Sequence, residues 1–147
     1  MTISIVDSKK TIGISNVGTQ GLAGPPGPPG SAGASYLQLE AGENLGGQRA
    51  VIVSAGTAVY ADNTNLNHAN KAVGITAAAF NTGVTGNVQS GGELTGLSGL
   101  TAGMPIYLST SGTLTQTTPT GGFIQQLGIA VSATSMLIEI QPSIVTG

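Results

Sequence analysis

The chain has 147 residues, of which 39% are hydrophobic and only 7% are charged, and its formal net charge is −2. This length allows one domain with an appendage, while the low charge predicts a surface largely covered by further copies or by a larger assembly. Basic residues are too few for a nucleic-acid partner, no segment is long and apolar enough for a secretory signal or a membrane span, and the absence of cysteine excludes disulfides, thiolate zinc sites and cysteine nucleophiles.

Residues 1–17, "MTISIVDSKKTIGISNV", alternate in two short bursts that predict two strands joined by a turn at residues 8–10. A lone two-stranded hairpin is marginal in water, so we expect this extended segment to dock on a larger structure. Strand addition to an existing sheet is the expected mode of docking. The apolar docking face would consist of Ile3, Ile5, Val6, Ile12 and Ile14.

Residues 18–35 contain glycine at every third position. The glycines are Gly18, Gly21, Gly24, Gly27, Gly30 and Gly33, and "GPPGPPG" lies at the centre of the run. Strict period three predicts a collagen-like triple helix, a rod of about 50 Å that makes the protein a homotrimer. A flexible Gly/Pro linker is the alternative. Because six triplets are too few to hold three chains alone, the stalk needs a trimeric neighbour.

Residues 36–147 show β patterning throughout and no amphipathic helical period. The predicted strands are 49–54, 58–61, 72–80, 86–90, 105–109, 112–117, 125–132 and 135–141. Tight turns are expected at 109–112 and 132–135. Gly128, between apolar strand positions, indicates a bulge or the close approach of another backbone, for which a second subunit is one source. The sequence therefore predicts a mainly β chain whose C-terminal knob is a small β-barrel or β-sandwich.

Residues able to support catalysis are few. His68 is the only histidine, and it lies in an Asn-rich run that favours a solvated loop, although a three-fold metal site built from three copies of His68 is conceivable. Glu40 and Glu43 are expected to be solubilising loop carboxylates, and Ser54 and Ser90 have no base in a recognisable motif. We therefore expect no enzyme activity, no catalytic residue, no cofactor and no metal.

A polar run that follows the predicted strand 58–61 is a candidate ligand loop. Its residues are Tyr60, Asn63, Asn65, Asn67 and His68. Amides and an imidazole could hydrogen-bond a sugar while the tyrosine ring stacks on it, which makes a glycan a candidate ligand. The alternative is a neutral hydrophilic loop.

Residues 91–142, "GGELTGLSGLTAGMPIYLSTSGTLTQTTPTGGFIQQLGIAVSATSMLIEIQP", resemble the β-rich outer domain of many tailed-phage virion proteins, among them head fibres, head decoration proteins and tail fibres. The family pattern runs "G-x-L-T-x-L", then "L-T-x-G-x-x-Y-L-S-x-x-G-x-(L/I)-T-x-T-x-P", then "Q-x-L/V-G-x-A-x-S-x-T-x-L-x-I". The matching positions here are Gly92, Leu94, Leu97, 100–109, 112–119 and 126–138. Short collagen-like stretches are also common in phage fibre and decoration proteins, so both features point to the same class.

The resemblance implies a structural virion protein, either a trimeric capsid decoration protein or a head fibre. Residues 1–17 would attach to the major capsid protein at three-fold or quasi-three-fold sites, residues 18–35 would form the stalk, and residues 36–147 would form the projecting knob. Such a protein is made in the cytoplasm of the bacterial host and resides on the outer surface of the capsid. A tail fibre or adhesin that binds a host glycan is the alternative, disfavoured by the scarcity of aromatic residues. A tailspike enzyme would need a longer chain and paired carboxylates.

Overall fold

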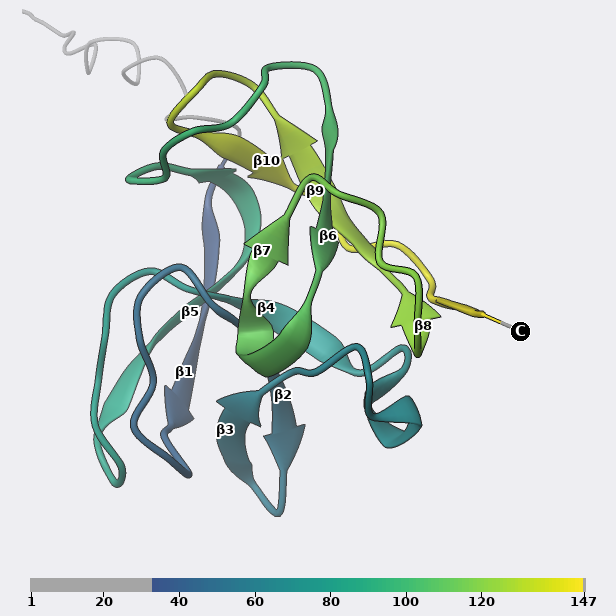
Figure 1. The fold of residues 1–147 in the computed structure, drawn as a ribbon. Helices are drawn as coiled ribbons and strands as arrows, with labels where there is room; N and C mark the ends of the chain where they lie inside the picture. The colour runs from purple at the N-terminus through teal and green to yellow at the C-terminus, as the bar shows by residue number, and fades with distance from the viewer. Residues whose placement is uncertain (1–32, 147) are drawn as a thin grey trace, which may run out of the picture. The chain divides into compact units, whose positions relative to one another are not determined.

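The computed structural model describes residues 33–146, which form a mainly β unit (Figure 1). The predicted docking segment 1–17 and the Gly-X-Y triplets up to residue 32 lie outside the described residues. The strands are β1 (Ser35–Glu40), β2 (Ala50–Ser54), β3 (Thr57–Tyr60), β4 (Ala72–Thr76), β5 (Thr85–Leu94), β6 (Pro105–Leu108), β7 (Leu114–Thr115), β8 (Phe123–Ile124), β9 (Gln126–Ala130), β10 (Met136–Ile138) and β11 (Ile144–Val145). Two single-turn 3-10 helices are η1 (Leu66–His68) and η2 (Thr110–Gly112).

Nine of the strands form one curled antiparallel sheet in which the long strand β5 belongs to two parts. In the first sub-sheet the order is β1-β5-β4-β2-β3, and in the second it is β5-β10-β9-β6-β7. The first sub-sheet curls until the chain just after β1 meets β3, through a bridge between Ala41 and Ala58. In Figure 1 the β2–β3 hairpin and the β9–β10 pair lie at opposite ends of the view. The expected β-rich knob is therefore a curled antiparallel half-barrel.

Strand β5 changes sub-sheet at a bend around Gly91 and Gly92. Gly92 has a φ of 84°, and a Cβ there would lie 2.5 Å from the Cα of Ala34, so both the left-handed backbone and the close approach require glycine. The Gln89 side chain is 2% exposed and spans the bend, because its amide donates to the carbonyl oxygens of Gly91 at 3.1 Å and Glu93 at 2.9 Å. These contacts fix the angle between the two sub-sheets.

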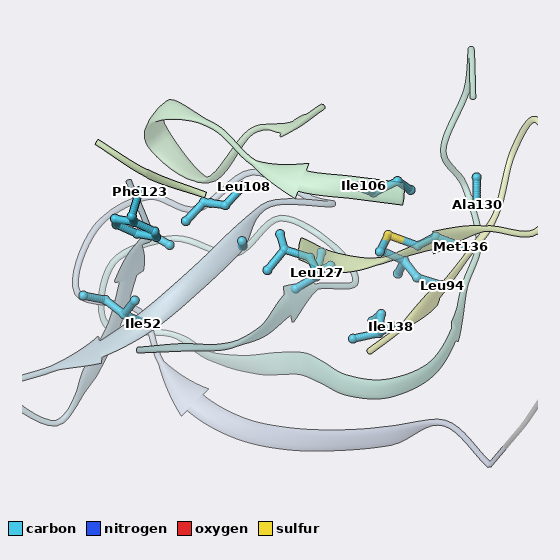
Figure 2. Close-up of a cluster of buried hydrophobic side chains, with 12 residues drawn as sticks. Ile52, Leu94, Ile106, Leu108, Phe123, Leu127, Ala130, Met136 and Ile138 are labelled. Carbon is cyan, nitrogen blue, oxygen red and sulfur yellow. The ribbon is translucent and has the colours of Figure 1, made fainter. Parts of the chain in front are cut away.

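The two sub-sheets enclose two hydrophobic clusters. The smaller cluster lies within the curl of the first sub-sheet and consists of Ala41, Leu45, Val51, Ala58 and Val88. The larger cluster joins the two sub-sheets and consists of Ala50, Ile52, Ala61, Ile75, Leu94, Ile106, Leu108, Phe123, Leu127, Ala130, Met136 and Ile138. Figure 2 shows the larger cluster with Ile52 and Phe123 at one end and Met136 and Leu94 at the other. Because successive residues of a strand point to opposite faces, β2 contributes to both clusters.

Most strands lie where the sequence predicts them, although several differ in length. The predicted strand 72–80 ends at Thr76, and of the predicted strand 112–117 only Leu114–Thr115 is paired, because the preceding residues form η2. Strands β1, β8 and β11 were not predicted. The hairpin expected at 132–135 is confirmed, since the Val131 N–H donates to the Ser135 carbonyl at 3.0 Å between β9 and β10.

The boundary between the Gly-X-Y run and the knob differs from the predicted position. Ser35, assigned by the sequence to the stalk, is the first residue of β1 and pairs with Gly91 of β5. Gly33 has a φ of 60°, outside the polyproline II region that a collagen triple helix uses. The sixth triplet is therefore part of the transition into the sheet in this structure.

Candidate functional site

The candidate ligand loop connects β3 to β4 and is built around η1. The Asn65 side chain caps η1 by accepting a hydrogen bond from the Asn67 N–H at 3.0 Å. The Ala69 N–H and the Lys71 N–H then bond to the carbonyls of Leu66 and His68, which closes the turn before β4. Local Asn capping of this kind explains why an Asn-rich run adopts one compact conformation.

Asp62 organises the start of this loop. Its carboxylate accepts hydrogen bonds from the Thr64 hydroxyl at 2.5 Å, from the Thr64 N–H at 2.9 Å and from the Ser111 N–H at 3.3 Å. Partial burial by itself would raise the pKa of Asp62, but the hydrogen bonds from Thr64 and Ser111, together with the nearby His68, outweigh it and lower the pKa below its ordinary value. The charged carboxylate thus ties the loop to η2.

His68 is half-buried and engaged within the loop, unlike the solvated side chain that the sequence predicts. Its Nδ1 accepts a hydrogen bond from the Asp62 N–H at 3.1 Å, and its Nε2 lies 3.2 Å from the amide nitrogen of Asn65. Both ring nitrogens of His68 therefore contact groups inside the loop, and these contacts help to hold the loop in its conformation. Within residues 33–146, no three His, Asp or Glu side chains gather closely enough to hold a metal ion.

The five predicted ligand residues do not form one surface. Asn63 is only 4% exposed, and its amide donates to the Gly121 carbonyl at 3.1 Å, so the prediction that it faces a ligand is wrong. Tyr60 is half-buried, and its hydroxyl accepts a hydrogen bond from the Gly46 N–H at 2.7 Å. Asn65 and Asn67 remain exposed at the tip of the loop. Hydrogen bonds to residues distant in the sequence therefore hold the side chains of Tyr60 and Asn63 within the fold.

The Tyr60 ring is covered by a residue that the sequence analysis did not single out. The guanidinium carbon of Arg49 lies 5.3 Å from the ring centroid, and an Arg49 N–H donates to the Ser111 carbonyl at 3.0 Å. A cation over an aromatic face is attractive, so Arg49 occupies the surface proposed for sugar stacking. Arg49 also lines a shallow pocket of about 260 Å³ with Gln48, Ser98 and Thr113.

The residues considered for catalysis are separated in the structure. The Ser90 hydroxyl donates to the Ser35 carbonyl at 3.4 Å, and Ser54 is exposed at the end of β2. Glu43, predicted to be a solubilising residue, accepts a hydrogen bond from the Tyr60 N–H at 3.0 Å and so fixes the loop after β1. In the described part of the chain, no hydrogen bond links a serine hydroxyl to His68.

The outer side of the second sub-sheet carries an uncovered group of apolar residues. Pairing places Pro105 of β6 opposite Ile129 of β9, and Ile129 opposite Leu137 of β10, so the three side chains form a row across three strands. We call the group around this row the outer apolar face. It consists of Met104, Pro105, Tyr107, Ile129, Val131 and Leu137. The exposed fractions of Met104, Ile129 and Val131 are 47%, 38% and 49%.

A groove of about 550 Å³ adjoins this face at Tyr107. It is lined by Tyr107, Thr118, Ile124, Gln126, Gln141, Pro142 and Ile144. The pairing of β8 with β11 forms one wall, and Ile144 and Val145 of β11 are 67% and 60% exposed. Contiguous exposed apolar surface of this kind is typical of interaction sites.

No protein-family model and no curated protein matches this sequence. Residues 33–146 contain no helix with the length and hydropathy needed to cross a membrane.

Proposed function

We propose that this chain is a structural virion protein of a tailed phage, a trimeric capsid decoration protein or head fibre. Residues 1–17 dock on the major capsid protein, the collagen-like run that begins at Gly18 forms the stalk up to its transition into β1, and the β unit forms the knob. The observation that carries the proposal is the unbroken glycine period joined directly to a charge-poor β unit. The period requires three chains, and the low charge favours a surface covered in an assembly.

The arrangement of the knob supports a role in projection. Residues 33–146 form a curled sheet with its own hydrophobic clusters, so a knob can fold at the end of a stalk. Three short docking segments tied to one trimer would also bind together far more tightly than any one of them alone. Docking at a three-fold or quasi-three-fold site of the capsid would use this avidity fully.

Co-sedimentation with the particle tests the proposal. The purified full-length protein is incubated separately with isolated capsids and with isolated tails of the phage that encodes it. Saturable binding to capsids in multiples of three supports a decoration protein or head fibre. Binding to tails alone overturns the capsid assignment and favours a tail fibre or adhesin, and binding to neither overturns the virion assignment.

A double variant locates the docking segment. Ile5→Asp combined with Ile14→Asp should abolish attachment to capsids, because two charges cannot be buried at an apolar contact. Val53→Asp is the matched control, since Val53 is 43% exposed on the β2–β3 hairpin and carries the same change in the knob. Capsid binding retained by the double variant would contradict docking through residues 1–17.

Glycine replacement tests the stalk. Gly24→Ala combined with Gly27→Ala should remove the polyproline II circular-dichroism signal while the β signal persists, because only glycine fits at the axis of the triple helix. Pro25→Ala, which leaves the glycine period intact, is the control. A double variant that keeps its polyproline II signal and its trimeric mass would contradict the triple helix and favour a linker.

A further inference from the structure

We propose that the outer apolar face is the surface through which three copies of the knob pack around the three-fold axis. The occupant of this face is therefore a second and a third copy of the same chain. This inference rests on the proposed trimer, but it goes further because it assigns the contact between knobs to one side of one sub-sheet. The glycine period alone locates no contact within the knob.

The composition of the face favours burial. Pro105 and Tyr107 of β6, Ile129 of β9 and Leu137 of β10 lie on the outer side of the sub-sheet, Met104 directly precedes β6, and Val131 directly follows β9. The described residues provide no layer over Met104, Ile129 and Val131, which stay 38% to 49% exposed. The charged residues of residues 33–146 are Glu40, Glu43, Arg49, Asp62, Lys71, Glu93 and Glu139. Of these, Glu93 lies opposite Leu137, next to the row, and Glu139 directly follows the last residue of β10. The face is thus apolar in the centre with carboxylates at its border, the pattern of a protein interface.

The start of the β unit lies beside the strand that borders this face. Three chains of a triple helix surround one common axis, so the residue that follows the Gly-X-Y run must enter the knob close to that axis. In the structure, Ala34 packs against Gly92. Gly92 lies on β5, and the next residue of this strand, Glu93, is paired with Leu137 of the outer apolar face. The start of the β unit therefore lies at the strand that borders the face.

Cyclic symmetry explains why a single face on each copy is enough to form the contact between three knobs. In a cyclic trimer the same surface of each copy can turn toward the axis, where three sheets enclose a common apolar core. The first sub-sheet offers a weaker candidate, because its exposed apolar residues are Tyr36 and Leu37 of β1 and Val53 of β2. Tyr36 and Leu37 are successive residues of one strand and point to opposite faces, so these residues form no row across paired strands. Isolated exposed apolar residues are normal on protein surfaces.

Thiol protection in the full-length protein tests the inference, and the native chain contains no cysteine that would interfere. Ile129→Cys introduces a thiol on the outer apolar face. Val53→Cys and Leu66→Cys introduce thiols at control positions, where the native side chains are 43% and 55% exposed, against 38% for Ile129. Light scattering gives the mass of each variant, and the rate of alkylation by a maleimide measures access to its thiol.

In a trimer, Ile129→Cys should be alkylated at least about tenfold more slowly than either control, because access limits the reaction of a buried thiol. Alkylation of Ile129→Cys at the control rate in a protein of trimeric mass would overturn the inference and leave the proposed trimer standing. A monomeric mass for the unmodified native chain would instead remove the trimer itself, and the inference with it. If Ile129→Cys is the one variant of the three that loses the trimeric mass, this result supports the interface. Ile129→Val, a smaller change that keeps the side chain apolar, should then retain the trimeric mass.

Discussion

In the first sub-sheet β2 is buried on both faces, whereas in the second sub-sheet β9 is buried on one face only. Ala50, Val51 and Ile52 are at most 4% exposed, although they point to alternate sides of β2. On β9, Leu127 is fully buried and Ile129 is 38% exposed. The first sub-sheet curls around its own small hydrophobic cluster. In the second sub-sheet, only the side that faces the larger cluster is buried. The second sub-sheet therefore keeps apolar side chains exposed on its outer side.

The largest expected effect comes from breaking the core that the two sub-sheets share. Phe123 is fully buried in the larger cluster (Figure 2). Phe123→Ala should lower the free energy of unfolding by about 3 to 5 kcal/mol, through lost burial and the cavity that remains. Urea denaturation at fixed protein concentration measures this. Val53→Ala on the exposed hairpin should change stability by less than about 1 kcal/mol, and equal losses in the two variants would contradict the shared core.

The next effect is confined to the second sub-sheet. A Cβ at Gly128 would collide with the carbonyl oxygen of Leu137 and lie 2.7 Å from the Met136 side chain. The close neighbour predicted for Gly128 is thus β10 of the same chain. Gly128→Ala should cost about 2 to 3 kcal/mol through overpacking. Gly83→Ala should cost about 1 kcal/mol, because its φ of 83° is strained for alanine while no atom lies within 4 Å. A cost at Gly128 no greater than at Gly83 would argue against the tight β9–β10 contact.

A smaller effect is expected at the joint between the sub-sheets. Gln89→Leu removes the two hydrogen bonds that span the bend of β5 and should lower the free energy of unfolding by about 1 to 2 kcal/mol. Gln38→Leu on the exposed strand β1 should change it by less than about 0.5 kcal/mol. Amide hydrogen exchange should also quicken around residues 91–94 in Gln89→Leu. Unchanged exchange there would show that the bend does not depend on this side chain.

The smallest effect concerns the loop between β3 and β4, which the Asp62 carboxylate ties to η2. Because the pKa of Asp62 is lowered in the folded state, its carboxylate contributes stability above the ordinary value of 3.8, and this contribution is lost as the pH falls through and below that value. Asp62→Asn should flatten the acid limb of the stability curve, recorded as thermal unfolding against pH. Glu40→Gln, at an exposed carboxylate on β1, is the control. The same acid dependence in Asp62→Asn and in the native chain would contradict this role.

Short runs of β-branched and aromatic residues made several strands predictable, while two-residue strands were not predictable. The residues of β2, β3 and β6 are rich in Val, Ile and Tyr and are bounded by turn-forming residues, so their positions follow from the sequence. Strand β1 directly follows the Gly-X-Y run, and its Ser35 was assigned to the stalk. Strands β8 and β11 contain two residues each, which is too few to show a period.

The candidate ligand loop was identified in the right place, but its residues were assigned the wrong surroundings. Asn63 is polar and lies in a turn-rich run, so exposure was the natural expectation. Its burial depends on the Gly121 carbonyl, 58 residues away in the sequence. Arg49 covers Tyr60 and contacts Ser111 in the same way, across separations that no local pattern encodes.

The sequence by itself determined the β content, the glycine period and the scarcity of charge, because each depends only on residue type and local spacing. Alternation also fixed which residues share a side of each strand. Only the tertiary structure decided which side meets the core, because that choice depends on the bend of β5 at Gly92 and on pairings such as Ile129 with Leu137. The outer apolar face therefore became visible only after the two sub-sheets were assembled.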